Sequence, residues 1–237
     1  MFASLLVFVA GCETIYIPAH EASPPPCGLI VIYPGASGVP AEQLAWPIGL
    51  RQAGVNEAIE IVSWGRPGDA VFNATAVARH HEWSVNEAQR LARIIDDHPG
   101  CPVTLVGYSA GAAMTVFVAE SMPPDRLLER VVLLSADLSP QYDLRPALDR
   151  TRRGIVSYWS PLDRDTVDLT YVVGTVDGSI GPPAGSVGFE TRDERLIQVS
   201  WNADMIRYGN FGGHFDYVFN PPWIERFAAE WIRVPQQ

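Results

Sequence analysis

The chain has little positive charge. Its 237 residues include 27 acidic and 17 basic side chains, and the formal net charge is −10 at pH 7. These charges are dispersed, without a run of five of one sign. Nucleic-acid binding depends on clustered basic side chains that release the counterions of phosphate groups. We therefore expect a solvated acidic surface and no nucleic-acid partner.

The signatures of nucleotide and metal sites are also missing. Neither the P-loop pattern nor the glycine pattern of dinucleotide-binding folds occurs in the sequence. His80-His81-Glu82 brings together ligand-type side chains, but neighbours in sequence point apart on a helix or a strand. We expect a protein that works without a metal ion or a cofactor.

The apolar run from Phe2 to Gly11 is too short to span a bilayer but has the length of a signal-peptide core. It ends in Val9-Ala10-Gly11-Cys12, which resembles the bacterial lipobox, where the cysteine is lipidated and becomes N-terminal. The resemblance implies a signal peptide over 1–11 and an exported protein of the cell envelope or periplasm, anchored to the membrane through Cys12. A buried strand and a non-lipidated signal peptide are the alternatives. The proline-rich segment 12–26 is predicted to be a stiff tether.

The remaining residues, 27–237, are predicted to form one domain without repeats or low-complexity segments. Strands are predicted at 29–33, 58–62, 103–106, 130–134 and 155–159, and helices at 41–53, 83–97, 112–120 and about 222–234. This alternation predicts a three-layer α/β/α sandwich, with a mostly parallel sheet covered by helices on both faces. The loops that follow parallel strands meet at one edge of the sheet, where chemistry is expected.

The most informative of these loops is Gly107-Tyr108-Ser109-Ala110-Gly111. It lies between a β-branched run and a predicted helix rich in small residues, which is the context of a nucleophile elbow. The turn is so sharp that side chains two residues before and after the serine would clash, so both positions are glycine. We predict that Ser109 is a nucleophile held in a strained backbone conformation.

A serine becomes nucleophilic when an imidazole takes its proton and a carboxylate orients that imidazole. Among the five histidines, only His214 follows the elbow, in a glycine-flanked loop before the last predicted helix. Asp163, shortly after the 155–159 strand, is the expected acid. Asp165, Asp137 and Asp177 are alternatives for the same role.

The serine elbow, the order Ser…Asp…His and the alternating strands and helices resemble the α/β-hydrolase superfamily over about residues 27–235. The resemblance implies a compact serine esterase or lipase-like member, with a sheet that lacks the first two of the family's eight strands. It also implies an oxyanion hole made of backbone N–H groups. One donor would be Ala110, and the other Ala36 or Ser37 in the loop after the first predicted strand.

The resemblance further implies a serine hydrolase that cleaves carboxylic esters of small molecules or lipids through an acyl-enzyme on Ser109. An amidase, a peptidase or an acyltransferase of the same fold is the nearest alternative, since fold and triad do not determine the leaving group. A non-catalytic binding protein of the cell envelope is the alternative from another class.

Two cysteines lie at the start of neighbouring strands in this resemblance. Cys27 precedes the strand before the oxyanion loop, and Cys101 precedes the strand before the elbow. An oxidising compartment would close this pair into a disulfide. Two buried thiols are the alternative.

Overall fold

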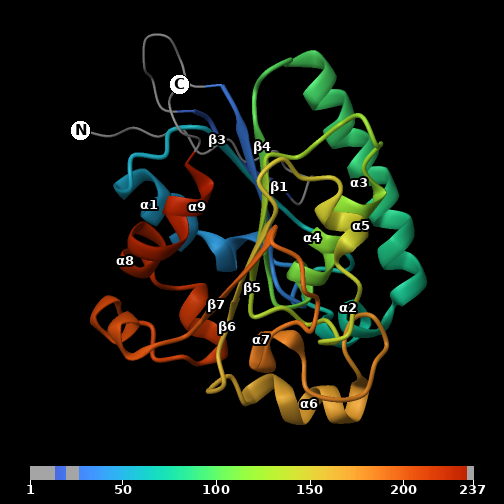
Figure 1. Ribbon diagram of the computed structural model, residues 1–237, viewed down its shortest axis with the longest axis vertical. Coiled ribbons are helices and arrows are strands. Elements are labelled where there is room, and N and C mark those ends of the chain that lie inside the picture. Colours follow the sequence, from blue (N-terminus) through green and yellow to red (C-terminus); the bar gives the residue numbers. More distant parts are fainter. Residues whose placement is uncertain (1–13, 20–26, 234–237) are drawn as a thin grey trace.

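The computed structural model describes residues 14–19 and 27–233 (Figure 1). The predicted signal peptide, Cys12 and most of the predicted tether lie outside the described residues.

The described residues form one seven-stranded sheet in the order β1-β3-β2-β4-β5-β6-β7. All neighbouring strands are parallel except β1, which pairs antiparallel with β3. The strands are β1 (Thr14–Ile17), β2 (Leu29–Tyr33), β3 (Ala58–Val62), β4 (Val103–Tyr108), β5 (Arg130–Leu134), β6 (Ile155–Trp159) and β7 (Leu196–Ser200). Central strands β2, β4 and β5 are buried along their whole length, as expected of a parallel sheet covered on both faces.

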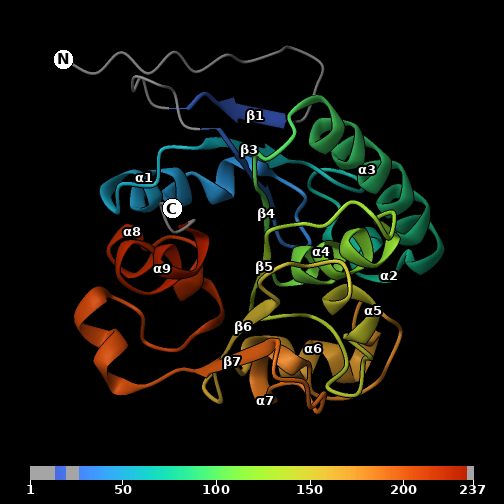
Figure 2. The same cartoon turned by 45° about the horizontal axis from the view of Figure 1, so that its top comes forward.

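Helices cover both faces of the sheet, which confirms the predicted three-layer sandwich (Figure 2). One face carries α1 (Ala45–Gln52), α8 (Pro221–Trp223), a π-helical turn (Ile224–Ala228) and α9 (Ala229–Ile232). The other face carries α3 (Val77–Asp97), α4 (Ala110–Ser121) and α5 (Arg145–Leu148). Strand residues alternate between the two cores: Val31 packs on the α4 side, and Ile30 and Ile32 on the α1 side.

The helices α2 (Ala70–Thr75), α6 (Asp165–Val173) and α7 (Ala184–Val187) follow the ends of β3 and β6. Figure 1 shows α6 and α7 at the lower end of the sheet, with α2 beside them. The 3-10 helices lie at Pro40–Gln43, Ala203–Tyr208 and His214–Tyr217. The loops that contain the predicted catalytic residues are therefore gathered at this end, because the carboxyl ends of parallel strands meet at one edge of the sheet.

The sheet has two strands that the sequence analysis did not predict. Edge strand β7 is partly exposed along its length. Strand β1 comes from the segment expected to be a tether, and its register pairs Thr14 with Val62 and Ile17 with Ile59. The described sheet thus has seven strands, against the six that the resemblance implied, and the first of them precedes residue 27.

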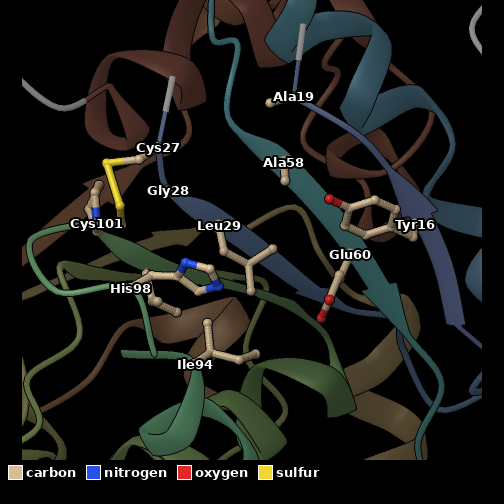
Figure 3. Close-up of a pocket in the computed structure, with 12 residues that line it drawn as sticks. Tyr16, Ala19, Cys27, Gly28, Leu29, Ala58, Glu60, Ile94, His98 and Cys101 are labelled. Atoms are coloured by element: carbon tan, nitrogen blue, oxygen red, sulfur yellow. A yellow bond between two sulfur atoms is a disulfide. The ribbon is translucent and has the colours of Figure 1, made fainter. Parts of the chain in front are cut away.

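A disulfide joins Cys27 and Cys101, with their Cα atoms 5.2 Å apart. The parallel pairing of β2 with β4, which aligns Leu29 with Val103, brings the two cysteines together. Figure 3 shows the disulfide beside a cavity of about 350 Å³ that Tyr16, Glu60 and His98 also line. This cavity lies where the strands begin, away from the loops that follow them.

Among the described helices, none combines the length and the apolar character needed to cross a bilayer.

Candidate active site

Ser109 lies in the sharp turn between β4 and α4 with φ 55° and ψ −123°, a conformation that non-glycine residues rarely adopt. A Cβ at Gly107 would overlap the Thr115 side chain, and one at Gly111 would overlap the carbonyl oxygens of Tyr33 and Pro34. Glycine is therefore required at both positions, because neighbouring atoms approach these residues closely. The fold supports the strained serine through Ser109 N–H, which donates to the Leu134 carbonyl at 2.9 Å.

The structure brings Ser109, His214 and Asp163 together from three separate loops. His214 Nε2 is 3.0 Å from Ser109 Oγ, and His214 Nδ1 is 2.8 Å from Asp163 Oδ2. All three side chains are buried, and Asp163 has no exposed surface. A buried carboxylate, an imidazole and a hydroxyl connected in this order can move the hydroxyl proton to the imidazole.

Ser135 is a fourth member of this group, and sequence reasoning missed it. Its hydroxyl donates to Asp163 Oδ2 and lies 3.0 Å from His214 Nδ1. It follows β5 directly and has φ 47°, the only positive φ besides that of Ser109 among the described non-glycine residues. A serine after a strand carries no motif, so only its strained backbone, which the sequence does not reveal, would have marked it.

The alternative acids do not contact His214. Asp165 is exposed in the first turn of α6. Asp177 accepts hydrogen bonds from Ser139 N–H and from two hydroxyl groups of its own loop. Asp137 faces the same cavity as Ser109 but has no hydrogen bond to His214. Of the four candidates, Asp163 is the one in contact with the imidazole.

Both predicted oxyanion donors lie beside Ser109. Ala110 is the first residue of α4, and Ala36 lines the cavity that Ser109 faces. Within the described part of the chain, neither backbone N–H has a protein acceptor. Ser37 is the residue with the alternative backbone N–H donor. Its side-chain hydroxyl donates a hydrogen bond to Glu42 Oε2 at 2.6 Å.

Asn73, which the sequence analysis did not single out, holds the loop that contains Ala36. Its side-chain amide is fully buried and donates to the carbonyls of Ala36 and Arg66, both at 2.8 Å. Its Oδ1 accepts from Arg66 N–H at 2.7 Å. These bonds connect the loop after β2 with the loop after β3 and would keep the Ala36 N–H oriented.

The cavity above Ser109 has a volume of about 370 Å³. Its walls come from α2, α6, the loop after β2 and the His214 loop, and most are apolar, including Val71, Leu169, Val173 and Phe215. A cavity of this size and character suits a small organic ligand. The cavity in Figure 3 is lined by none of the predicted catalytic residues.

Two polar groups in the cavity above Ser109 have strongly shifted pKa values. Burial raises the pKa of the Asp137 carboxyl to about 7, with the nearby carboxylates of Asp177 and Asp163 adding to the effect and His214 opposing it. Burial also raises the pKa of the Tyr108 hydroxyl, so this group stays neutral. Shifted pKa values in a cleft are typical of functional sites.

No protein-family model matches this sequence. No curated protein matches it either.

Solved structures match it along nearly the whole chain. TT1662 from Thermus thermophilus is 14% identical, with a TM-score of 0.56 and coverage of 97% of this chain and 96% of that one. The esterase domain of a Rhodothermus marinus protein is 13% identical, with a TM-score of 0.54 and coverage of 92% and 90%. XC6422 from Xanthomonas campestris, described as an α/β serine hydrolase without a lid, is 11% identical, with a TM-score of 0.54 and coverage of 94% and 91%. At these identities the likeness concerns the fold, and the chain has the α/β-hydrolase fold.

Proposed function

We propose that this protein is a serine hydrolase that cleaves carboxylic esters. The observation that carries the proposal is the hydrogen-bonded series Ser109–His214–Asp163 at 3.0 and 2.8 Å, built on a strained serine that faces an apolar cavity. The α/β-hydrolase fold supports the proposal, because Ser109 occupies the strand-to-helix turn where that fold places its nucleophile.

In the proposed reaction, Ser109 Oγ attacks the ester carbonyl carbon while His214 Nε2 takes the hydroxyl proton. Asp163 accepts the Nδ1–H bond, keeps the imidazole in the required tautomer and stabilises its cation. The Ala110 and Ala36 N–H groups are the proposed donors to the carbonyl oxygen as it gains negative charge.

When the tetrahedral intermediate collapses, His214 gives its proton to the departing alcohol, and the acyl group remains on Ser109. Water then attacks the acyl-enzyme with His214 again as the base, which releases the acid and restores the serine. The open, mostly apolar cavity supports an acyl ester of a small molecule or lipid as the substrate.

The test is hydrolysis of short and medium p-nitrophenyl esters by the full chain, beside Ser109→Ala and His214→Ala. We expect kcat to fall by about a thousandfold or more in either variant, because the two residues act as one unit. His98→Ala is the control, since His98 is exposed and outside the triad. The chain should not be shortened to residue 27, because β1 pairs with β3.

A fluorophosphonate probe separates the alternatives. Labelling of the parent that disappears in Ser109→Ala would support an activated serine, and ester and amide substrates compared side by side would then separate an esterase from an amidase or peptidase. A folded parent that neither turns over esters nor reacts with the probe would overturn the enzyme proposal in favour of a binding protein.

We also propose export and lipid anchoring through Cys12. The lipobox-like segment supports this, and the Cys27–Cys101 disulfide is the kind of bond that forms in oxidising compartments. Expression of the full chain in a bacterium should give a membrane-associated protein that incorporates labelled palmitate. Cys12→Ser should abolish both the membrane association and the palmitate incorporation. A variant that is distributed between the membrane and soluble fractions like the parent would contradict the anchor.

A further inference from the structure

The charged side chains in the mostly apolar cavity above Ser109 are acidic. Three carboxyl side chains line it, those of Glu42, Asp137 and Asp165. No arginine or lysine is among the described residues that line it, although the chain has 17 basic residues. A cavity lined by charge of one sign attracts ligands of the opposite sign.

Asp137 differs from the other two carboxyl groups because one of its carboxyl oxygens is buried without a partner among the described residues. Glu42 accepts a hydrogen bond from Ser37, and Asp165 is exposed to solvent. The Asp137 Oδ1 atom is buried without a hydrogen bond to any described residue. A buried carboxyl oxygen without a partner is costly, so its presence in the cavity above Ser109 points to a ligand that completes it.

Tyr108 and Phe215 add aromatic surface to the same cavity. Tyr108 is only 4% exposed, and its hydroxyl also lacks a partner in the described structure. Phe215 is 59% exposed beside His214. Aromatic faces attract organic cations, and carboxylates reinforce that attraction.

We propose that Asp137 is a specificity residue that binds an ammonium or quaternary ammonium group of the substrate, which makes cationic esters the preferred class. The inference rests on the proposed ester hydrolysis and deepens it. An apolar acyl chain would use Val71, Leu169 and Val173 but would leave the Asp137 carboxyl unpaired. A cation next to the reacting ester would form an ion pair with the Asp137 carboxylate and would also contact the aromatic rings.

The test compares esters that differ only in charge. For a cation on the acyl side, the pair is the p-nitrophenyl ester of hexanoate with a terminal amine and that of heptanoate, in which a methyl group replaces the ammonium. For a cation on the alcohol side, the pair is choline butyrate and its carbon isostere. We expect kcat/KM to favour the cationic member by about tenfold or more in one of the two pairs, the size expected of a hydrogen bond to a charged group.

Asp137→Asn should reduce this cationic-to-neutral ratio by about tenfold or more, because the amide keeps the shape and removes the charge. The matched control is Asp204→Asn, which removes one negative charge from an exposed position outside the cavity and should keep the parent's ratio. The pair that responds identifies the side of the ester that carries the cation.

The inference and the proposed function fail in different ways. Hydrolysis of neutral esters with a ratio near one in both pairs overturns the cation site and leaves the esterase proposal intact. A cationic preference that Asp137→Asn keeps, or that Asp204→Asn loses equally, overturns the role of Asp137. No hydrolysis and no fluorophosphonate labelling of a folded parent overturns both.

A measurement on the parent alone covers the case in which Asp137→Asn does not fold. Butyltrimethylammonium should slow fluorophosphonate labelling of Ser109 at concentrations where its neutral carbon isostere does not. Equal effects of the two compounds would overturn the cation site.

Discussion

Ser135 connects the proposed acid with the proposed base, since its hydroxyl contacts both Asp163 and His214. We predict that Ser135→Ala lowers kcat for p-nitrophenyl esters by about tenfold and changes KM little, because Asp163 loses one of the hydrogen bonds that orient it. Stopped-time assays at saturating ester measure this change.

Ser135→Gly is the matched variant. Glycine adopts φ 47° without strain, so it removes the hydroxyl and relieves the backbone. Equal losses of kcat in the alanine and glycine variants would assign the effect to the hydroxyl. Parent-like turnover in the glycine variant would contradict the positioning role.

Asp137 should make stability depend on pH. Its pKa is about 7 in the folded chain, against 3.8 as the ordinary value, with His214, Asp163 and Asp177 as the charged neighbours. The unfolded chain therefore releases this proton first as the pH rises. The folded state loses stability between about pH 4 and pH 7, and the full penalty remains above that range.

Asp137→Asn removes this penalty. The free energy of unfolding of the variant relative to the parent should therefore grow by about 3 kcal/mol between about pH 5 and pH 8. Urea titrations at the two pH values measure it, with Asp204→Asn as the control that should show no such growth. A difference that is constant with pH would contradict the shifted pKa.

At the scale of single residues, a glycine-flanked serine, chain order and loop position were enough to predict that Ser109, His214 and Asp163 lie together, and the structure brings them into hydrogen-bond contact. Ser135 and Asn73 could not be selected in this way. Their partners are distant in sequence, and a serine or an asparagine in a loop is common.

The elbow between β4 and α4 is the element on which the site depends. We predict that Gly111→Ala destabilises the protein by about 3 kcal/mol or more, because the new methyl group would overlap the backbone carbonyls at the end of β2, which cannot move without disturbing the sheet. Thermal unfolding of the purified variant measures the loss.

Gly54→Ala is the control for the elbow. Gly54 has φ 78° and nothing within 4 Å of an added Cβ, so alanine there should cost only the strain of a left-handed conformation, about 1–2 kcal/mol. A Gly111→Ala protein as stable as the Gly54→Ala protein would show that the elbow tolerates the side chain.

Among the elements, the five inner strands β2 to β6 were predictable because short runs rich in β-branched and apolar residues are typical of a parallel sheet. The edge strands were not. In β1 and β7 the described residues are only partly buried, so the apolar pattern that marks a central strand is weak. Helix α6 was also missed, because most of it is only partly buried or exposed and it lacks a clear apolar stripe.

At the scale of the whole molecule, the parallel sheet explains why residues over a hundred positions apart meet. Ser109 and His214 are 105 residues apart in sequence, yet both belong to loops at the carboxyl end of the strands. This convergence follows from the right-handed crossovers, so the sequence pattern predicts it. The position of each edge strand depends on strand pairing, which the apolar pattern of the sequence does not encode.

The disulfide acts on the whole molecule because it closes a long loop. Cys27 and Cys101 are separated by 74 positions in the sequence, and the segment between them contains β2, β3 and α3. A loop of this length loses much conformational freedom in the unfolded state, which predicts a stabilisation of about 4 kcal/mol. The double variant Cys27→Ala/Cys101→Ala should therefore melt about 8–16 °C below the parent.

Reductant provides the matched measurement for this prediction. Dithiothreitol should lower the melting temperature of the parent toward that of the double variant and leave the double variant unchanged. Ester hydrolysis at room temperature should persist in the double variant, because the disulfide lies where the strands begin, while Ser109 and His214 lie beyond their other end. A parent that melts at the same temperature with and without reductant would contradict a stabilising disulfide. A double variant that melts at the parent's temperature but has lost activity would show that the two ends of the sheet are coupled.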